Sequence, residues 1–393
     1  MKQIPTQSSL IYVMKKKKRK QFHELADKYK SSDFSSKCEY FEKCGGCMFQ
    51  DIPYESQLLL KKEYLNELFK NIIEIDKVEP SPTLRYRNRM DMVCAFGKIG
   101  LREAGSYKFV TDIQSCNIMQ TETDELYQKL YSLLKEKEIE DYNYLNHKGY
   151  LRYVVFRQAY FTKEVMLSFV TALKENRLGA VIAEIDKCAG SINILFNDGL
   201  ADQSFGDIIE TNKPYIEEKF DTITYRITPN SFFQSNSPVA LEMYRKIKNN
   251  VKGKTLDLYS GIGSIALYIA DSVEKVTGVE IVEEAVKSAE DNKSLNNIKN
   301  TDFILGDVLD FAKERLNDFD TLILDPPRAG MHPKMLKLIN QNAPEKIIYM
   351  SCNPVSFRDD LAGLDNYKIE SFEAFDMFPQ TPHVETLAVL KRI

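Results

Sequence analysis

From residue 254 to residue 393, short apolar stretches alternate with segments of helical pattern, and this alternation constrains the fold more than any other feature of the sequence. Each apolar stretch has the length and composition of a buried strand, and a helix-length segment separates most of them. Such alternation predicts an α/β fold with a doubly wound sheet of about seven strands. The expected strands have the sequences KTLDLY, KVTGVE, TDFILGD, TLILDPP, KIIYMSC, YKIESFEAFDMF and ETLAVLKRI.

The chain is expected to have four parts. Residues 226–393 form the α/β domain, and residues 76–225 contain strand-like runs with helical stretches between them, which predicts an α+β middle domain. Residues 38–75 combine a cysteine-rich turn with an amphipathic helix. Residues 1–37 carry ten Lys or Arg against three Asp or Glu, a net charge of +7 in a chain of net charge −4. This basic arm indicates either a polyanionic partner or a flexible, solubilising tail.

The sequence also bears on the compartment. It contains no apolar run of membrane-spanning length, and its N-terminal residues include no apolar stretch of signal-peptide length. Seven cysteines, an odd number, without an export signal indicate reduced thiols. We therefore expect a cytoplasmic protein, and no feature indicates more than a monomer.

A glycine-rich turn, in LDLYSGIGSIALYIA, follows the first strand of the expected α/β domain and leads into a helix. Gly261 and Gly263 allow the backbone to approach a ligand closely. Glu280, at the end of the next strand, is placed to bind ribose hydroxyls. Taken alone, these features fit a nicotinamide dinucleotide as well as S-adenosylmethionine.

Aspartates at the carboxyl ends of three strands favour S-adenosylmethionine. Asp257 precedes the glycines, Asp307 ends the third strand and Asp325 follows the fourth. Ligands of open α/β sheets bind at this edge. Carboxylates there suit an ammonium, an adenine amino group and ribose, and they repel a pyrophosphate. The structural alternatives are a helix cap for Asp307 and a turn for Asp325.

The fifth expected strand ends in a cysteine, Cys352, followed by a turn and a new helix. Methylation of an amino group needs no thiol, because the nitrogen already has a lone pair. An unactivated pyrimidine carbon does need one: a thiolate that adds to carbon 6 of uracil makes carbon 5 nucleophilic, and a base must afterwards remove the carbon 5 proton. Glu385 and His383, which lie at the start of the last strand, are candidates for that base.

Four separated motifs in the same order resemble those of the RNA (uracil-5-)-methyltransferases, the family that makes 5-methyluridine. They are PNSFFQSN (229–236), DPPR with Asp325, SCNP with Cys352 and HVET with Glu385. The resemblance covers residues 38–393 and implies a methyltransferase with the α/β domain as its catalytic domain.

The resemblance also assigns roles to individual residues. It implies that Cys352 is the nucleophile and Glu385 the base, so that His383 becomes a neighbour of the base. Ser264 departs from the family pattern, because some members carry Asn there. The residues that the resemblance implies as S-adenosylmethionine contacts are Gln234, Tyr259, Glu280, Asp307 and Asp325.

Three cysteines within ten residues, Cys38, Cys44 and Cys47, indicate a metal site. Zinc is one possibility, although zinc sites more often have two Cys-x2-Cys pairs. The fourth ligand must come from farther along the chain, where Cys116 follows an expected loop and is a better choice than Cys94 in mid-strand. Family members with this spacing hold a 4Fe–4S cluster on the same four positions. The resemblance therefore implies that cofactor, in a structural role.

A uracil within structured RNA must leave its stack before carbon 6 can meet a thiol. Candidates for stacking against freed bases, with core packing as the alternative, are Phe232, Phe233 and Phe375. Candidates for binding phosphate from the middle domain, with a solvated edge as the alternative, are Arg85, Arg87 and Arg89. Many family members carry a small barrel domain ahead of the cysteines, and we expect this chain to lack it.

These observations predict an RNA 5-methyluridine methyltransferase that acts on 23S rRNA, because a cluster without the barrel resembles the ribosomal branch of the family. The T-loop uridine of tRNA is the alternative substrate. Other classes also remain: a nicotinamide-dependent iron–sulfur oxidoreductase, and an iron–sulfur RNA-binding protein without catalysis. The DPPR motif argues against the oxidoreductase, and a dispensable Cys352 would argue for the binding protein.

Overall fold

The computed structural model describes residue 22 and residues 24–106, 108–342 and 344–393. The run of basic residues at 15–20, on which the prediction of an RNA-binding or flexible arm rests, lies outside the described residues. In the described part of the chain, none of the helices is long and apolar enough to cross a membrane.

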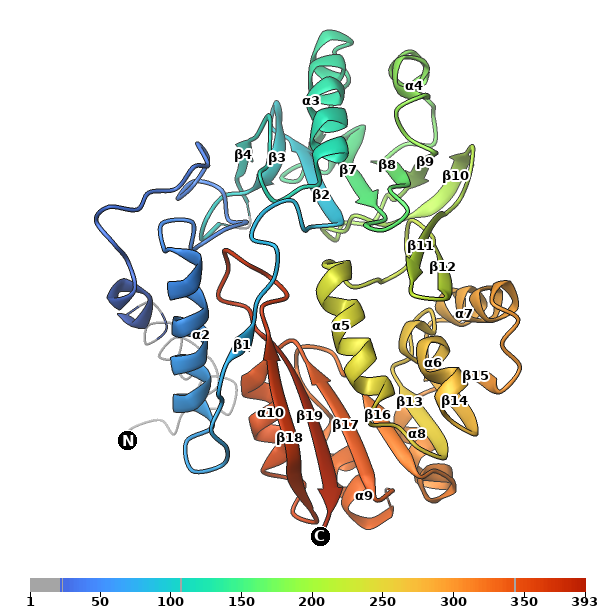
Figure 1. Ribbon diagram of the computed structural model, residues 1–393. Coiled ribbons are helices and arrows are strands. Elements are labelled where there is room, and N and C mark those ends of the chain that lie inside the picture. The colour runs from blue at the N-terminus through green and yellow to red at the C-terminus, as the bar shows by residue number, and fades with distance from the viewer. Residues whose placement is uncertain (1–21, 23, 107, 343) are drawn as a thin grey trace, which may run out of the picture.

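An eight-stranded sheet forms one half of the molecule, with strand order β1-β18-β19-β17-β16-β13-β14-β15 (Figure 1). The predicted α/β fold is confirmed, and the seven strands expected after residue 254 are present. The eighth strand, β1 (Val78–Glu79), comes from far earlier in the chain and pairs with the outer edge of the sheet. The other strands are β13 (Lys254–Leu258), β14 (Lys275–Glu280), β15 (Thr301–Leu305), β16 (Thr321–Leu324), β17 (Lys346–Ser351), β18 (Tyr367–Phe375) and β19 (Glu385–Arg392).

The sheet is mixed rather than fully parallel. Strands β13 to β17 pair in parallel, as right-handed strand–helix crossovers produce. Strand β19 runs antiparallel to β17 on one side and to β18 on the other. As a result, the amino end of β19 lies at the same edge of the sheet as the carboxyl ends of β16 and β17.

Helices cover the two faces of this sheet around separate apolar cores. One core includes side chains of α5 and α6 and of the hairpin β11–β12, and the other includes side chains of α2 and α8 to α10. The hairpin strands are β11 (Ile216–Phe220) and β12 (Ile223–Ile227). The helices are α2 (Tyr54–Leu68), α5 (Ser237–Lys248), α6 (Ser264–Ile269), α7 (Glu283–Leu295), α8 (Val308–Arg315), α9 (Pro333–Asn342) and α10 (Pro354–Leu361).

A second sheet of seven strands lies above the first in Figure 1, in the order β10-β9-β8-β7-β2-β3-β4. Only β8 and β9 pair in parallel, so this part of the chain has the expected α+β character. One of the strand-like runs of this region, residues 90–101, forms parts of two strands, because Phe96 and Gly97 both have positive φ and form a hairpin turn. The strands are β2 (Arg89–Ala95), β3 (Lys98–Arg102), β4 (Val110–Asp112), β7 (Leu151–Gln158), β8 (Val165–Thr171), β9 (Ser191–Phe196) and β10 (Asp207–Thr211).

Helices α3 (Thr121–Glu136) and α4 (Gly179–Ile185) pack on one face of this second sheet, and their apolar side chains share its core. A small hairpin of β5 (Tyr142–Asn143) and β6 (Lys148–Gly149) completes the elements of this region.

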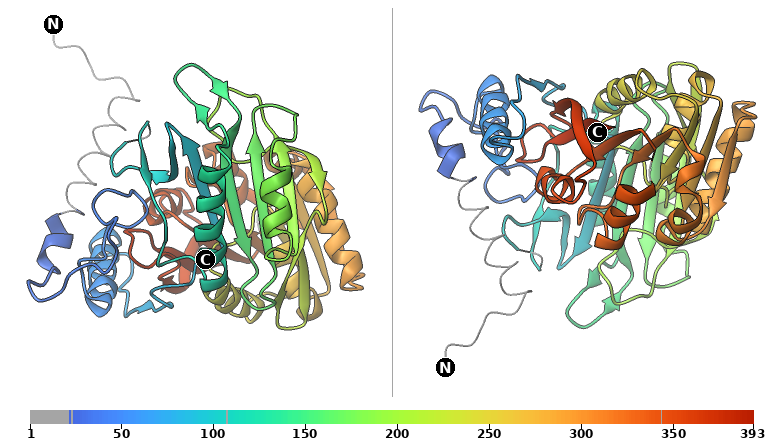
Figure 2. Two further views of the ribbon diagram at one scale, coloured as in Figure 1. Left: turned by 90° about the horizontal axis from the view of Figure 1, so that it is seen from above. Right: turned by 90° about the horizontal axis from the view of Figure 1, so that it is seen from below.

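The N-terminal segment connects the two halves and holds the loop between β18 and β19. In both views of Figure 2 this blue segment lies at one side of the molecule, next to the red C-terminal strands. The backbone N–H groups of Met48 and Phe49 donate to the carbonyl oxygen of Gln380, at 2.8 and 3.0 Å. The amide of Gln57 on α2 bonds both the side chain and the backbone of Gln380. Lys61 and Asp376 form a fully buried ion pair beside them. These contacts fix the loop that precedes β19, and therefore the position of Glu385.

Candidate active site

Strand register brings the predicted nucleophile and base together. In the antiparallel pair β17–β19, Ser351 lies opposite Thr386, so the next step of the register puts Cys352 beside Glu385. Strand β16 pairs in parallel with β17 and ends at Leu324, so Asp325 follows at the same edge. Three residues that are up to 60 positions apart in the sequence therefore converge at one edge of the sheet.

These side chains open into a cavity of about 790 Å³ between the two halves of the molecule. Its volume lies within the range of roughly 300–1,000 Å³ that is usual for ligand sites. We call it the active-site cavity. The predicted catalytic and cofactor residues that line it are Gln234, Tyr259, Glu280, Asp325, Cys352 and Glu385.

Asp307 is the one predicted cofactor residue that does not line the cavity. Its carboxylate instead caps α8, accepting hydrogen bonds from the backbone N–H groups of Leu309 and Asp310 at 2.8 and 3.1 Å. The same carboxylate lies near the phenol of Tyr259, whose pKa it raises in addition to the larger effect of burial. The helix-cap alternative is therefore what the structure contains, and a cofactor contact for Asp307 stays a prediction.

The glycine-rich turn holds Glu280 at the cavity wall. The carboxylate of Glu280 accepts from the N–H of Gly261 at 3.0 Å and from the N–H groups of Ile281 and Val282 at 2.8 and 2.9 Å. Gly263 has φ +76°, and a Cβ there would lie 2.5 Å from the ring of Phe303. Glycine is thus required at 263 for close packing.

Buried carboxyl groups crowd one wall of the cavity. Glu385 is only 2% exposed, and burial followed by the charge of Asp325 raises its pKa well above the usual value, while Arg328 opposes the shift. Burial raises the pKa of Asp325 to about 7. Asp257 lies behind them, and its Oδ2 has no hydrogen-bond partner among the described residues. Burial, Asp325 and Glu280 all raise the pKa of Asp257. A cation in the cavity would relieve this crowding, which fits a sulfonium and an ammonium and disfavours a pyrophosphate.

Cys352 is half-buried, and its thiol faces these carboxyls. Burial, then the charges of Glu385 and Asp325, raise the pKa of Cys352 to about 11, and Arg328 partly opposes them. The group is therefore a thiol at neutral pH in the protein alone, and added positive charge in the cavity would favour the thiolate.

His383, the alternative base, forms part of a different contact. Its Nδ1 accepts a hydrogen bond from the guanidinium of Arg328 at 3.0 Å. Burial, then Arg328, lower the pKa of His383 to about 4, so the imidazole is neutral and its Nδ1 lone pair is already used. The carboxylate of Glu385, by contrast, is not hydrogen-bonded to Arg328 and has a raised pKa, so it remains the better base.

The structure corrects two of the stacking candidates and two of the phosphate-binding candidates. Phe232 lines the active-site cavity and is 69% exposed, whereas Phe233 and Phe375 are buried in an apolar core. Arg87 also lines the cavity. The other two arginines are ion-paired and do not line the cavity, because Arg85 bonds Asp124 and Arg89 bonds Asp91. Strand β2 begins at Arg89, so the three arginines do not share one strand.

Several cavity residues carried no signal in the sequence. Gly45, Gly46 and Met48 reach the cavity from the cysteine-rich segment, and Phe378 and Thr381 reach it from the loop before β19. They have no motif of their own, and only the packing of the N-terminal segment against that loop brings them to the site.

The predicted cluster cysteines surround one small pocket. Cys94 is buried in mid-strand, as expected, and lies away from it. Among the residues that the structure describes, no group of three or more His, Cys, Asp or Glu side chains is arranged to hold a metal ion. The cysteines that line this pocket are Cys38, Cys44, Cys47 and Cys116.

Comparison with known proteins places the chain in a family. A family model described as tRNA (Uracil-5-)-methyltransferase matches residues 53–393. A Pyrococcus furiosus protein named tRNA (uracil(54)-C(5))-methyltransferase is 38% identical over 361 residues, which span 91% of this chain and 85% of that protein. A Clostridium tetani protein named as an uncharacterized RNA methyltransferase is 36% identical over 384 residues, spanning 91% and 84%.

A solved structure agrees with these sequence relatives. The crystal structure of the Pyrococcus abyssi tRNA (uracil-54, C5)-methyltransferase in complex with S-adenosyl-L-homocysteine matches with a TM-score of 0.78 and 37% identity. The match covers 88% of this chain and 86% of that one. The prediction of an enzyme is confirmed, and the oxidoreductase and non-catalytic alternatives are not supported. The chain belongs to the tRNA (uracil-5-)-methyltransferase family and is an RNA uracil-5 methyltransferase.

Proposed function

We propose that the protein methylates carbon 5 of uridine 54 in the T loop of tRNA, with S-adenosylmethionine as the methyl donor. The observation that carries the chemistry is the pairing of Cys352 with Glu385 in one carboxylate-lined cavity. The names of the Pyrococcus relatives support the tRNA substrate. They favour the alternative of the sequence analysis over its main prediction, 23S rRNA, which remains the second candidate.

The reaction begins at carbon 6 of the uracil. The thiol of Cys352 gives its proton to water, and the thiolate forms an S–C6 bond while the C5–C6 π electrons move into an enolate. Bound S-adenosylmethionine supplies an electrophilic methyl group, which carbon 5 takes up as the C–S⁺ bond breaks. The ionised carboxylate of Glu385 then removes the carbon 5 proton, the C5–C6 double bond re-forms and the Cys352 thiolate leaves. The raised pKa of Glu385 makes its carboxylate a stronger base for this step.

The carboxyl-lined wall of the cavity would hold the methyl donor. Glu280, fixed by three backbone N–H groups, would bind the ribose hydroxyls, and the carboxyl group of Asp325 would favour the positive charge of the donor. Gln234 and Tyr259 complete this wall, and Asp307 acts from outside the cavity through Tyr259. The crowded carboxyl groups described above would ionise more readily beside a cationic ligand, which favours a donor of this charge.

Replacement of Asp325 by asparagine should weaken S-adenosylmethionine binding roughly tenfold at slightly alkaline pH, because it removes a charge-assisted contact. Since the pKa of Asp325 is raised to about 7, its carboxylate is charged above that pH and neutral below it. Wild-type affinity should therefore fall with decreasing pH below 7, by roughly tenfold per pH unit at most, and the variant should lose this dependence. Calorimetric titrations across neutral pH test this, with Asp318→Asn at an exposed ion pair as the control. An unchanged pH profile in Asp325→Asn would assign the dependence to another group.

The RNA must present an extruded uracil to Cys352. Phe232 is exposed at the cavity and offers a ring on which the extruded base stacks, and Arg87 adds a cation to the same cavity. In this proposal the second sheet and the N-terminal segment carry the phosphate contacts.

The cysteine pocket holds a 4Fe–4S cluster in this proposal, because four thiols are a complete donor set for one. Cys116→Ser should lower the iron content of anaerobically purified protein from about four per chain and remove its brown colour. Cys188→Ser, at an exposed thiol outside the pocket, should leave both unchanged. Stoichiometric zinc without iron in the wild type would contradict the cluster.

A methyl-transfer assay with labelled S-adenosylmethionine tests which RNA is the substrate. The two RNAs are 23S rRNA and bulk tRNA, each isolated from cells that lack this gene, and the products are identified as nucleosides by mass. Label recovered as 5-methyluridine in tRNA supports the proposal, and mapping of the site to position 54 completes it. Label in 23S rRNA would keep the chemistry and transfer the protein to the second candidate function. No label in either RNA would overturn both.

A further inference from the structure

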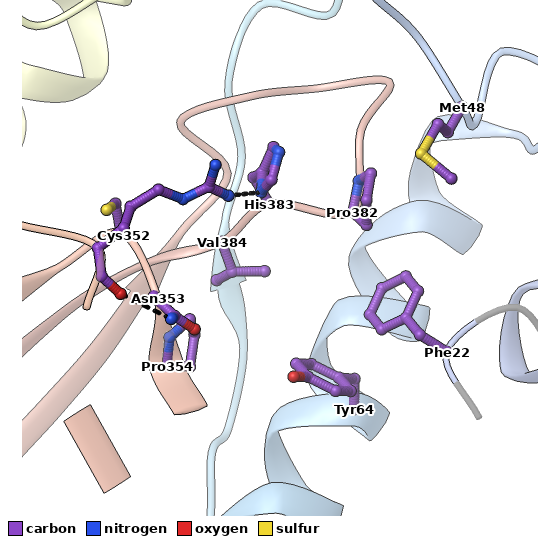
Figure 3. A pocket seen from close by; sticks show the side chains of 10 residues that line it. Phe22, Met48, Tyr64, Cys352, Asn353, Pro354, Pro382, His383 and Val384 are labelled. Atoms are coloured by element: carbon purple, nitrogen blue, oxygen red, sulfur yellow. Dashed lines mark hydrogen bonds between the residues drawn. The ribbon is translucent and has the colours of Figure 1, made fainter. Parts of the chain in front are cut away.

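A second pocket, of about 350 Å³, adjoins the active-site cavity (Figure 3). We call it the side pocket. Its volume lies at the lower end of the range of roughly 300–1,000 Å³ that is usual for small ligands. It shares with the active-site cavity the side chains Met48, Arg328, Cys352, Pro382 and His383. The two spaces therefore meet at these residues, Cys352 among them. The residues that line only the side pocket are Phe22, Tyr64, Asn353, Pro354 and Val384.

One wall of the side pocket is aromatic. Tyr64 lies on α2, and its ring packs edge-on against that of Phe22, with centroids 4.8 Å apart and planes at 73°. Phe22 also stacks on Phe49, with centroids 5.7 Å apart. Figure 3 shows Phe22 and Tyr64 on one side and Cys352, Asn353 and Pro354 on the other. Aromatic side chains that face an open pocket suit a planar base, whatever its sequence identity.

Arg328 provides a positive charge where the side pocket meets the active-site cavity. Arg328 is exposed and lines both of them. In the described ranges it forms no ion pair, and its hydrogen bond is to the neutral ring of His383. Its charge is therefore available to an anion. The carboxyls of Glu280, Asp325 and Glu385 line the active-site cavity and not the side pocket. Among the described residues, the side pocket thus lacks the carboxyl-lined wall that suits a methyl donor, and a phosphodiester is the anion that an RNA strand would bring there.

We propose that the side pocket receives the base of the nucleotide next to the target uridine, stacked on Phe22 and Tyr64, with the phosphate between the two nucleotides at Arg328. This inference rests on the proposed function, because the target uracil must occupy the active-site cavity above Cys352. Adjacent nucleotides of one strand are connected by a single phosphate, and the two spaces are adjacent across Arg328 and Cys352. The enzyme thus binds two extruded nucleotides of the strand, the target uridine and its neighbour, rather than the target uridine alone.

Kinetic measurements on RNA hairpins of the T arm test whether the effect of Phe22→Ala depends on the presence of the neighbouring base; we call this dependence coupling. Three hairpins are compared: the intact sequence, one with an abasic site on the 5′ side of the target uridine, and one with an abasic site on its 3′ side. Phe22→Ala should lower kcat/KM on the intact hairpin about tenfold, the effect expected of one lost base–aromatic stack. On the abasic hairpin that lacks the stacked base, Phe22→Ala should cause no further loss. This outcome also identifies which neighbour the pocket takes.

Two control variants accompany Phe22→Ala. Phe22→Tyr keeps the ring and should retain the wild-type kcat/KM. Phe34→Ala removes a phenylalanine that is 41% exposed and lines neither space, and should behave as the wild type does.

A binding measurement supplies a readout that does not depend on turnover. With 2-aminopurine at the identified neighbour position, the wild type should quench its fluorescence on binding, because stacking on a ring quenches it. Phe22→Ala should leave it bright. Equal loss of kcat/KM on intact and abasic hairpins would show that Phe22 only packs against Tyr64 and Phe49, and would overturn the inference. An unaltered kcat/KM in Phe22→Ala would overturn it as well.

The wild-type result separates this inference from the proposed function. Methylation of the intact T-arm hairpin without coupling to Phe22 removes the side-pocket proposal alone. If the T-arm hairpin is not methylated but a 23S rRNA fragment is, the same coupling is measured on that fragment. If neither RNA is methylated, the proposed function fails, and the side-pocket assignment fails with it.

Discussion

Replacement of Cys352 by alanine is expected to reduce methyl transfer by a factor on the order of 10⁴ or more, because none of the other described residues that line the cavity carries a thiol that could add to carbon 6. The variant should still bind RNA and S-adenosylmethionine, since the side chain is small and half-buried. Two measurements apply. The first is labelled methyl transfer, and the second is trapping with RNA that carries 5-fluorouridine, in which fluorine replaces the proton that must leave. The wild type should form a protein–RNA adduct that survives denaturation, and Cys352→Ala should form none.

The control for this prediction is a cysteine elsewhere in the chain. Cys188 has an exposed thiol, and Cys188→Ala should keep both activity and trapping. An adduct that persists in Cys352→Ala would show that the nucleophile is a different residue. Failure of trapping in the wild type, despite measurable methyl transfer, would exclude covalent catalysis altogether.

Replacement of Glu385 by glutamine should block the reaction after the methyl group has been transferred. The amide keeps the shape of the side chain but cannot accept the carbon 5 proton, so turnover should fall by roughly 10²- to 10⁴-fold. Because Cys352 leaves only when that proton is removed, the variant should accumulate a covalent adduct with ordinary uridine RNA. The RNA in that adduct should already be methylated. Denaturing gel electrophoresis with labelled methyl donor detects it, and the wild type should show little.

Glu370 on β18 is exposed and provides a matched control, since Glu370→Gln makes the same chemical change outside the cavity. That variant should turn over normally. If Glu385→Gln lost methyl transfer without accumulating an adduct, Glu385 would act before the methyl step, in forming the thiolate or in binding. If it turned over normally, the base would be another group, and His383 would be the next candidate.

The sequence by itself determined the α/β half of the molecule and the chemistry at its edge. Buried strands read as continuous apolar runs, so the strands after residue 254 could be identified without any contact being known. The polar residues directly after those runs, Asp325 and Cys352, had to lie at the carboxyl edge because parallel strands end together. Local pattern also predicted that Cys94 is buried in the core and that Cys116 lies beside the other three cysteines.

Local sequence pattern did not predict the surroundings of side chains whose position depends on packing between distant segments. Phe232 and Phe233 are adjacent, yet one is exposed at the cavity and the other lies in the core, and only the backbone after β12 decides which. The arginines at 85 and 89 found carboxylate partners that no spacing rule identifies.

The tertiary structure alone decided how the site is closed. Strand β1 and helix α2 pack on the catalytic sheet although they precede its other strands by more than 170 residues, and the buried pair of Lys61 and Asp376 fixes the loop before Glu385. The side pocket exists only because α2 and Phe22 lie against the turn that follows Cys352. The sequence of a segment gives its side chains, and its local periodicity indicates which of them are buried. Contacts between segments far apart depend on the packing of whole elements, which no short stretch of sequence contains.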